Sequence, residues 1–232
     1  MDLIIGKSEV GKSLFNVLKR VYDIKIQDKE PLKLREKVEI LHIAFPYSKA
    51  FIRFVKNYIK EYQPELTVIH STVPVGTTRK CGEKVLHSPV RGIHPNLEKS
   101  LLTFVKYIGG NKKYAKRIAK YFKRVRIKTK IFNKPETTEL LKLISTTYYA
   151  WNICFCKEVK RICDQYGLSF KEVYIDSNKT YNEGYTKLGK ENVVRPILIP
   201  MKGKIGGHCV IPNCYLLKDK ITRMILKFNT EY

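Results

Sequence analysis

A glycine-rich stretch near the N-terminus has the spacing of a phosphate-binding loop. Residues 4–17 read IIGKSEVGKSLFNV and fit two motifs at once. From Gly6 to Ser13 the spacing is G-x-x-x-x-G-K-S, which is typical of P-loops that bind nucleoside triphosphates. Gly6, Ser8 and Gly11 also match the dinucleotide motif G-x-G-x-x-G, with serine in place of the second glycine. The neighbouring elements must therefore decide which phosphate compound the stretch would bind.

The sequence around this loop predicts strands that alternate with helices. Residues 2–5 read as a short buried strand, residues 11–20 as an amphipathic helix, and residues 22–27 as a second strand. The other expected elements are strands at 38–46, 65–72, 84–89 and 126–132, and helices at 48–62, capped by Ser48, and at 112–126. Such alternation is typical of a parallel sheet covered by helices on both faces, so we expect an α/β fold.

The position of one acidic residue favours the dinucleotide. A P-loop needs an acidic metal-binding residue at the end of another strand, and the strands at 38–46 and 65–72 end in AFPYS and IHST. Asp28 follows Gly6 by 22 residues, where the dinucleotide motif places the acid that binds the ribose hydroxyls. An acid there also favours NAD over NADP because it repels a 2′-phosphate, although Lys29 weakens that preference. We therefore predict NAD as the cofactor.

In this interpretation the loop residues have separate tasks. Gly6 makes the tight turn, and Gly11 lets the helix approach the strand. Ser8 is small enough for the pyrophosphate to come near, and the helix N-terminus faces the phosphates. Lys12 and Ser13 are then ordinary residues of the first helix.

The composition indicates a globular protein with a strong positive charge. Hydrophobic residues make up 44% of the chain, and the six cysteines lack paired C-x-x-C spacing, which predicts reduced thiols in the cytoplasm. We expect no membrane span, signal peptide or metal cluster. The net charge of +24 would suit nucleic-acid binding, but no recognition motif supports it. A solvated basic helix face is the simpler interpretation, and an anionic small substrate would also benefit from the charge.

The character of the sequence changes after Pro135. The expected parts are one long apolar helical run at 136–167 that ends at Gly167, a second helix at 169–181, and an irregular glycine-rich segment at 182–207. We place the domain boundary at residue 133. Residues 1–133 would bind the dinucleotide, and residues 134–232 would form a mainly helical domain whose long helix serves as the spine of a homodimer.

Four further motifs follow the dinucleotide loop. They read STVPVGTT at 71–78, HSPVRGIHPN at 87–96, ELLKLISTTYYAWNI at 139–153 and GGHCVIPN at 206–213. Together and in this order they resemble the UDP-glucose/GDP-mannose dehydrogenase family, over most of the chain. The resemblance implies a Rossmann-type NAD-binding domain followed by a helical domain. It also implies oxidation of a sugar-nucleotide primary alcohol to an acid with two NAD.

The resemblance further implies roles for individual residues. Cys209 takes the position of the nucleophile, which would attack an aldehyde and form a thiohemiacetal. Lys142 takes the position of a lysine that stabilises the developing oxyanion, and Thr72 lies in the turn near nicotinamide and substrate. The expected cofactor contacts are Gly6, Ser8, Val10, Gly11, Asp28, Pro46 and Thr72. The expected substrate contacts are Arg91, His94, Thr146 and Gly207, and His94 or His208 would move a proton.

Three positions depart from the family pattern. A glutamate is replaced by Val90, an asparagine by Thr146 and an aspartate by Asn213. The two lost carboxylates would have managed protons and water, so Asn213 would only orient groups. The family's third domain, which grips the nucleotide part of the substrate, is expected to be missing.

Two hypotheses follow from these departures. The first is a divergent dehydrogenase that acts on an alcohol or aldehyde of a sugar or sugar nucleotide, by a single hydride transfer. The second is a non-catalytic NAD-binding or interaction protein derived from the family. The singled-out residues also have structural interpretations: a buried apolar Cys209, a surface Lys142, local hydrogen bonds for His94 and His208, an ion pair of Arg91 and a turn cap at Asn213.

Overall fold

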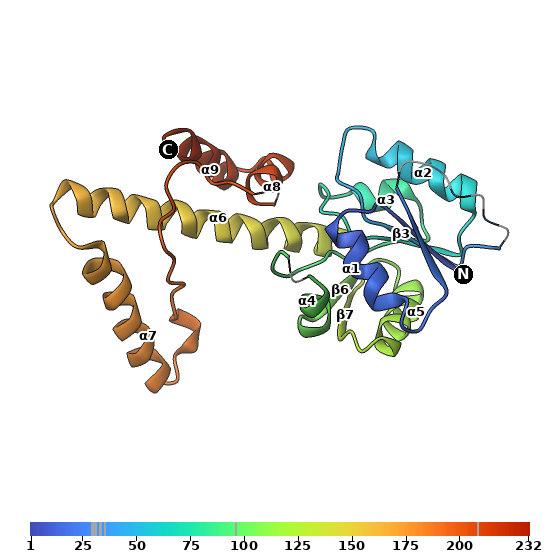
Figure 1. Ribbon diagram of the computed structural model, residues 1–232, viewed down its shortest axis with the longest axis horizontal. Helices are drawn as coiled ribbons and strands as arrows, with labels where there is room; N and C mark the ends of the chain where they lie inside the picture. Colours follow the sequence, from blue (N-terminus) through green and yellow to red (C-terminus); the bar gives the residue numbers. More distant parts are fainter. Residues whose placement is uncertain (29–31, 33, 35, 96, 208) are drawn as a thin grey trace. The chain divides into compact units, whose positions relative to one another are not determined.

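The computed structural model describes residues 1–28, 32, 34, 36–95, 97–207 and 209–232. The chain divides into two compact units, the sheet unit at residues 1–143 and the helical unit at residues 144–232 (Figure 1). Lys29 and His208, which the sequence singled out, lie outside the described residues. The proposed domain boundary at residue 133 falls just before helix α6 (Pro135–Gln165), which runs through the division between the units.

A seven-stranded sheet forms the centre of the sheet unit within the described residues. Its strands are β1 (Asp2–Ile5), β2 (Ile24–Gln27), β3 (Ile40–Ile43), β4 (Leu66–Ile69), β5 (Val85–His87), β6 (Lys106–Gly109) and β7 (Thr129–Phe132). Their order in the sheet is β2-β1-β3-β4-β5-β6-β7. The predicted α/β fold is confirmed. The sheet is not parallel throughout, however, because β5 and β6 pair antiparallel at His87 and Gly109.

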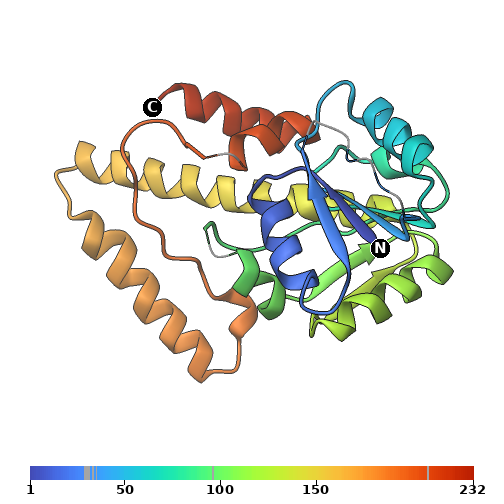
Figure 2. The ribbon, with the colours of Figure 1, turned by 45° about the vertical axis from the view of Figure 1, so that its right-hand side comes forward.

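Helices cover both faces of this sheet, as the alternating pattern predicted (Figure 2). One face packs on α1 (Glu9–Leu18), α4 (Leu97–Thr103) and α5 (Lys112–Arg124), and the other packs on α2 (Phe51–Tyr62) and α3 (Thr77–Cys81). Along β1, Ile4 belongs to the first core, whereas Leu3 and Ile5 belong to the second. Successive strand residues point to opposite faces, so a strand buried on both sides must be apolar throughout.

Short elements account for the differences from prediction in this unit. Strand β6 and helices α3 and α4 were not expected, because each has at most seven residues and no clear periodicity. The predicted cap at Ser48 is wrong, since α2 begins at Phe51 with Ala50 in the N-cap position. The predicted helix at 112–126 is confirmed as α5, whose apolar side is buried.

The helical unit is built around the second half of α6. The elements that follow are the π-helix η1 (Lys171–Asp176), α7 (Ser177–Lys187), the 3₁₀-helix η2 (Glu191–Val193), α8 (Val210–Leu217) and α9 (Lys220–Thr230). Ala150 and Cys154 of α6 pack against Cys214 of α8 and Ile225 of α9. The helix predicted at 169–181 continues to Lys187, and α8 and α9 were not expected. In the described part of the chain, none of the helices has both the length and the apolar character needed to cross a membrane.

Candidate functional site

The glycine loop after β1 has the close packing that a dinucleotide loop requires. Gly6 has a φ of +110°, and a Cβ added there would lie 2.9 Å from the backbone of Ala44. A Cβ on Gly11 would lie 1.9 Å from the carbonyl oxygen of Gly6. Any larger residue would therefore push α1 away from the loop, which explains why both positions are glycine. Val10, which precedes Gly11 in the first turn of α1, packs against the apolar cluster under this helix.

Ser8 occupies the place of the motif's second glycine, at the N-cap of α1. Its hydroxyl donates a hydrogen bond to the carbonyl oxygen of Ala44 at 2.9 Å, so its side chain is held by the sheet. Glu9 is the first residue of α1, and one of its carboxylate oxygens lies 2.5 Å from Nδ1 of His94. The structure thus places His94 beside the N-terminal end of α1.

A pocket of about 410 Å³ opens at the carboxyl ends of β1, β2 and β3. It is lined by Ile5, Gly6, Asp28, Phe45, Pro46, Phe54 and Tyr58. Strands β2 and β3 flank β1 on its two sides, so the pocket lies at a topological switch point, where open α/β sheets bind their ligands. Its volume is within the range of small-molecule sites. The structure therefore brings Gly6, Asp28 and Pro46 together, as predicted for a cofactor cleft.

The turn after β4 carries Thr72. Its neighbour Ser71 donates a hydrogen bond to the carbonyl oxygen of Phe45 at 2.6 Å, which fixes the turn beside the segment that lines the pocket. Lys142 lies on α6 in the same unit and is partly buried. Burial lowers the pKa of His87 to about 3, and the positive charge of Lys142 contributes to that lowering. Lys142 therefore contributes to the electrostatic potential at His87, the last residue of β5.

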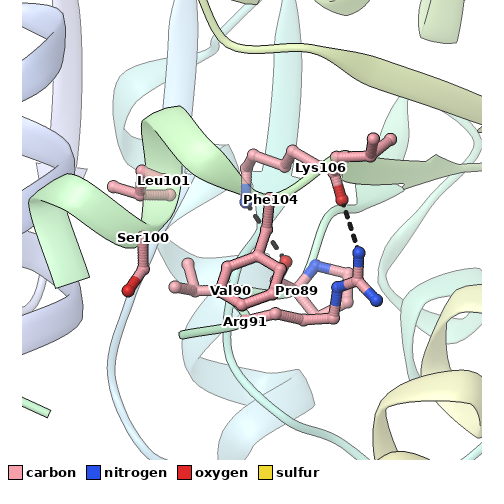
Figure 3. A pocket seen from close by; sticks show the side chains of 8 residues that line it. Pro89, Val90, Arg91, Ser100, Leu101, Phe104 and Lys106 are labelled. Atoms are coloured by element: carbon pink, nitrogen blue, oxygen red, sulfur yellow. Dashed lines mark hydrogen bonds between the residues drawn. The ribbon is translucent and has the colours of Figure 1, made fainter. Parts of the chain in front are cut away.

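Val90 and Arg91 lie in the segment after β5 (Figure 3). Val90 is 6% exposed and belongs to the apolar core, beside a cavity of about 10 Å³ that has room for one water molecule. The guanidinium group of Arg91 donates to the carbonyl oxygen of Val105 at 2.9 Å and lies 4.2 Å from the ring centre of Tyr107. Position 90 is thus a packing position here, and Arg91 is held against the neighbouring strand.

In the helical unit, Cys209, Asn213 and Thr146 come together. Cys209 is partly exposed in the N-cap position of α8, and its carbonyl oxygen accepts the backbone N–H of Asn213 at 3.2 Å. The buried amide of Asn213 donates to the hydroxyl of Thr146 on α6 at 3.2 Å. Gly207 has a φ of +85° with open space around it. Two of the replaced family positions, Thr146 and Asn213, therefore form one neutral hydrogen-bonded pair.

Comparison with known proteins identifies relatives of the chain, although no family model matches it. A UDP-N-acetyl-D-mannosamine dehydrogenase of Methanococcus vannielii is 30% identical over 173 residues, which are 71% of this chain and 38% of that enzyme. The same enzyme of Methanococcus maripaludis is 28% identical over 179 residues, which are 74% of this chain and 38% of the enzyme. The chain is a distant member of the nucleotide-sugar dehydrogenase family. It spans about two fifths of the length of these curated family members.

A solved structure of the nucleotide-sugar dehydrogenase family has the same fold. The UDP-D-ManNAc dehydrogenase of Pyrococcus horikoshii aligns with a TM-score of 0.77 over 99% of this chain and 68% of that one, at 20% identity. The α/β fold that the motifs implied is therefore confirmed.

Two aromatic residues of the pocket at the carboxyl ends of β1, β2 and β3 were not predicted from the sequence. Phe54 and Tyr58 line this pocket from α2. They are four residues apart on one helix, and Phe54 is 43% exposed while Tyr58 packs against the core, so an exposed aromatic residue beside the apolar face of an amphipathic helix was the available signal. Within the described residues, no three His, Cys, Asp or Glu side chains gather as a metal site.

Proposed function

We propose that this chain is an NAD-dependent oxidoreductase that acts on an alcohol or aldehyde of a sugar or sugar nucleotide. The observation that carries the proposal is the cleft in which Gly6, packed closely against Gly11, meets Asp28 and an aromatic wall. Family membership supports it, because the matched relatives are named as dehydrogenases of sugar nucleotides. In this proposal residues 1–133 bind NAD, and residues 134–232 form the domain for substrate and dimer contacts.

The residues of the cleft suit a dinucleotide. The loop at Gly6 and Gly11 lets the phosphates approach the N-terminus of α1, where one carboxylate oxygen of Glu9 is bound to Nδ1 of His94. Asp28 would accept hydrogen bonds from the ribose hydroxyls, while the apolar wall would hold the adenine. When bound, NAD supplies the hydride acceptor.

The residues that match catalytic positions of the family motifs would act on the substrate. Cys209 would serve as nucleophile or substrate contact, and Lys142 would stabilise negative charge on the substrate oxygen. Thr72 and Asn213 would orient polar groups. The chain's net charge of +24 would attract an anionic sugar nucleotide, and Arg91 would bind a phosphate or carboxylate of it.

The buried position of Val90 favours a single oxidation. A thioester must be attacked by water, and water needs a base to remove its proton. Val90 lies in the apolar core and Asn213 is an amide paired with Thr146, so neither can act as that base. One hydride transfer would convert the alcohol into an aldehyde with release of one proton.

The proposal is tested by NADH absorbance with a panel of UDP-N-acetyl-D-mannosamine, UDP-glucose and GDP-mannose. We expect one NADH per substrate molecule. Two NADH per substrate would contradict the single oxidation and show that other groups hydrolyse the thioester. NAD binding without NADH formation from any alcohol or aldehyde of this class would favour the second candidate, a non-catalytic NAD-binding protein, for which the neutral residues at Val90 and Asn213 are the supporting observation.

Replacement of Asp28 with alanine is expected to weaken NAD binding by about tenfold to a hundredfold, because a hydrogen bond to a charged group contributes about 1.5–3 kcal/mol. NADP binding should change less, so that the preference for NAD falls. Calorimetric titration of both nucleotides measures the two affinities. Asp23→Asn, at the opposite end of β2, is the matched control and should bind NAD like the unmodified chain. Equal losses for both nucleotides would contradict the role of Asp28.

Disruption of the exposed face of α6 is expected to convert a homodimer into monomers. Ile144, Tyr148, Phe155 and Ile162 are between 42% and 61% exposed, at helical spacings of four and seven residues. Such a stripe is typical of a surface that a second helix covers. The double variant Tyr148→Glu/Phe155→Glu should raise the dimer dissociation constant at least a hundredfold in sedimentation experiments. Lys179→Glu, exposed on α7, is the control, and a monomeric unmodified chain would contradict the proposal.

A further inference from the structure

We propose that Glu139 of α6 is a positioning residue that holds the turn at residues 71–78, and thereby Thr72, in a fixed register with Lys142. The catalytic meaning of this register rests on the proposed function. The contacts that support it lie wholly within the sheet unit.

Glu139 is completely buried, which is unusual for a carboxylate. Its two oxygens accept the backbone N–H groups of Gly76 at 2.6 Å and Thr78 at 2.7 Å. Burial raises its pKa, and the two backbone hydrogen bonds act in the opposite direction. Each oxygen therefore replaces water for one otherwise unpaired backbone donor at the start of α3. Both oxygens of the Glu139 carboxylate therefore bind the end of the turn at Gly76 and Thr78.

A second connection joins α6 to the other end of the turn. Thr138, the neighbour of Glu139, has its hydroxyl oxygen 2.8 Å from Nδ1 of His87, and both side chains are fully buried. The Nε2 atom of His87 lies 3.1 Å from the carbonyl oxygen of Ser71, to which it donates. Thr138 thus fixes the turn before Thr72, through His87, and Glu139 fixes the turn after Thr72.

The spacing along α6 couples this clamp to Lys142. Glu139 and Lys142 are three residues apart, so they lie on neighbouring positions of one helix face. The helix is continuous from Pro135 to Gln165, which makes it a rigid support between the two residues. Movement of the turn relative to α6 would therefore change the distance between Thr72 and Lys142, which the proposed reaction needs to be constant.

Another glutamate on the same helix provides a matched control. Glu136 lies one turn before Glu139 and also contacts α3, through an exposed ion pair with Arg79 at 2.5 Å. Exposed ion pairs contribute little to stability. Both glutamates thus connect the same two helices, but only Glu139 accepts backbone N–H groups of the turn.

The experiment compares Glu139→Gln with Glu136→Gln in the full chain. We expect amide hydrogen exchange at Gly76 and Thr78 to accelerate at least tenfold in Glu139→Gln and less than threefold in Glu136→Gln. In NADH assays kcat should fall about tenfold to a hundredfold for Glu139→Gln, with NAD affinity unchanged within threefold. Unchanged exchange would overturn the clamp. Faster exchange with an unchanged kcat would overturn its catalytic meaning.

The exchange measurement needs no turnover, so it separates the clamp from the proposed function. If the unmodified chain forms no NADH, the proposed function fails, while exchange still decides whether Glu139 holds the turn. If Glu139→Gln does not fold, Thr138→Val tests the other connection, with faster exchange expected at residues 71–73. Protection that remains at the level of the unmodified chain in Thr138→Val would contradict the proposal.

Discussion

Acidification is expected to destabilise the protein steeply, with the free energy of unfolding falling by about 4 kcal/mol per pH unit between pH 6 and pH 5. Three histidines, His42, His70 and His87, are at most 2% exposed. Burial lowers the pKa of His42 and His87 to about 3 and holds the pKa of His70 well below its usual range. In the unfolded chain each would have a pKa of about 6.5.

The hydrogen bond between His42 and His70 prevents the two rings from being charged at the same time. Nδ1 of His70 lies 2.9 Å from the carbonyl oxygen of Ser88, to which it must donate. Its Nε2 atom is then the acceptor for Nδ1 of His42 at 2.9 Å. Protons on both rings would place two N–H groups against each other, and the buried amine of Lys106, which donates to the same carbonyl oxygen at 2.7 Å, opposes further positive charge at His70.

The sign of the effect follows from proton binding. Below pH 6.5 the unfolded chain binds protons at all three histidines, while burial in the folded chain holds the pKa of each of them well below that value. Stability therefore increases with pH in this window, and it is lost as the pH falls. Each histidine contributes about 1.4 kcal/mol per pH unit at the limiting slope.

Urea unfolding at several pH values between 7 and 5 measures this dependence. The variant His42→Gln should reduce the slope of stability against pH by about one third. Val68→Ala, a change at a buried residue of β4 that does not titrate, should lower stability without altering the slope. A slope that is equally steep in His42→Gln, or flat in the unmodified chain, would contradict the neutral buried histidines.

Replacement of Cys209 with alanine is expected to lower turnover by about tenfold to a hundredfold, because the thiol would be a substrate contact that positions the alcohol for the single hydride transfer. The fold and the NAD affinity should be retained, since Cys209 is partly exposed at the start of α8 and lies outside the helical core. Steady-state NADH formation and calorimetric titration of NAD measure the two properties. An unchanged rate would remove Cys209 from the mechanism.

Cys214 on the same helix provides the contrasting control. Its side chain is 1% exposed, and burial raises the pKa of its thiol. Cys214→Ser places a hydroxyl in this apolar core and should lower stability, because a buried hydroxyl without a partner is unfavourable. The remaining folded protein should keep its turnover. Equal loss of turnover in both variants at temperatures where both are folded would contradict a specific role for Cys209.

Much of the fold, and several of the residues that line the pocket at Gly6, could be predicted from local patterns. The glycine spacing at Gly6 and Gly11 determines a backbone conformation, and Asp28 follows directly from the end of a strand. Apolar runs also identified β1, β3 and β4, because strands of a sheet covered on both faces are apolar throughout. These features depend on neighbours in the sequence, so the sequence alone contains them.

The contacts that were missed join distant parts of the chain. Glu139 meets the turn at Gly76, and His87 meets Thr138 more than 50 residues away. No local period indicates such pairs. Strand β6 was not predicted because a lysine in a sequence normally indicates an exposed position. Lys106 is instead buried and donates to backbone carbonyl oxygens.

The most direct test of the proposed cofactor is calorimetric titration of the full chain with NAD, NADP and ATP in parallel. We expect saturable binding of NAD, weaker binding of NADP because of Asp28, and no binding of ATP. The variant Gly11→Ala should lose NAD binding, because the added methyl group would meet the carbonyl oxygen of Gly6. Binding of ATP without binding of NAD would contradict the assignment of the glycine loop to a dinucleotide.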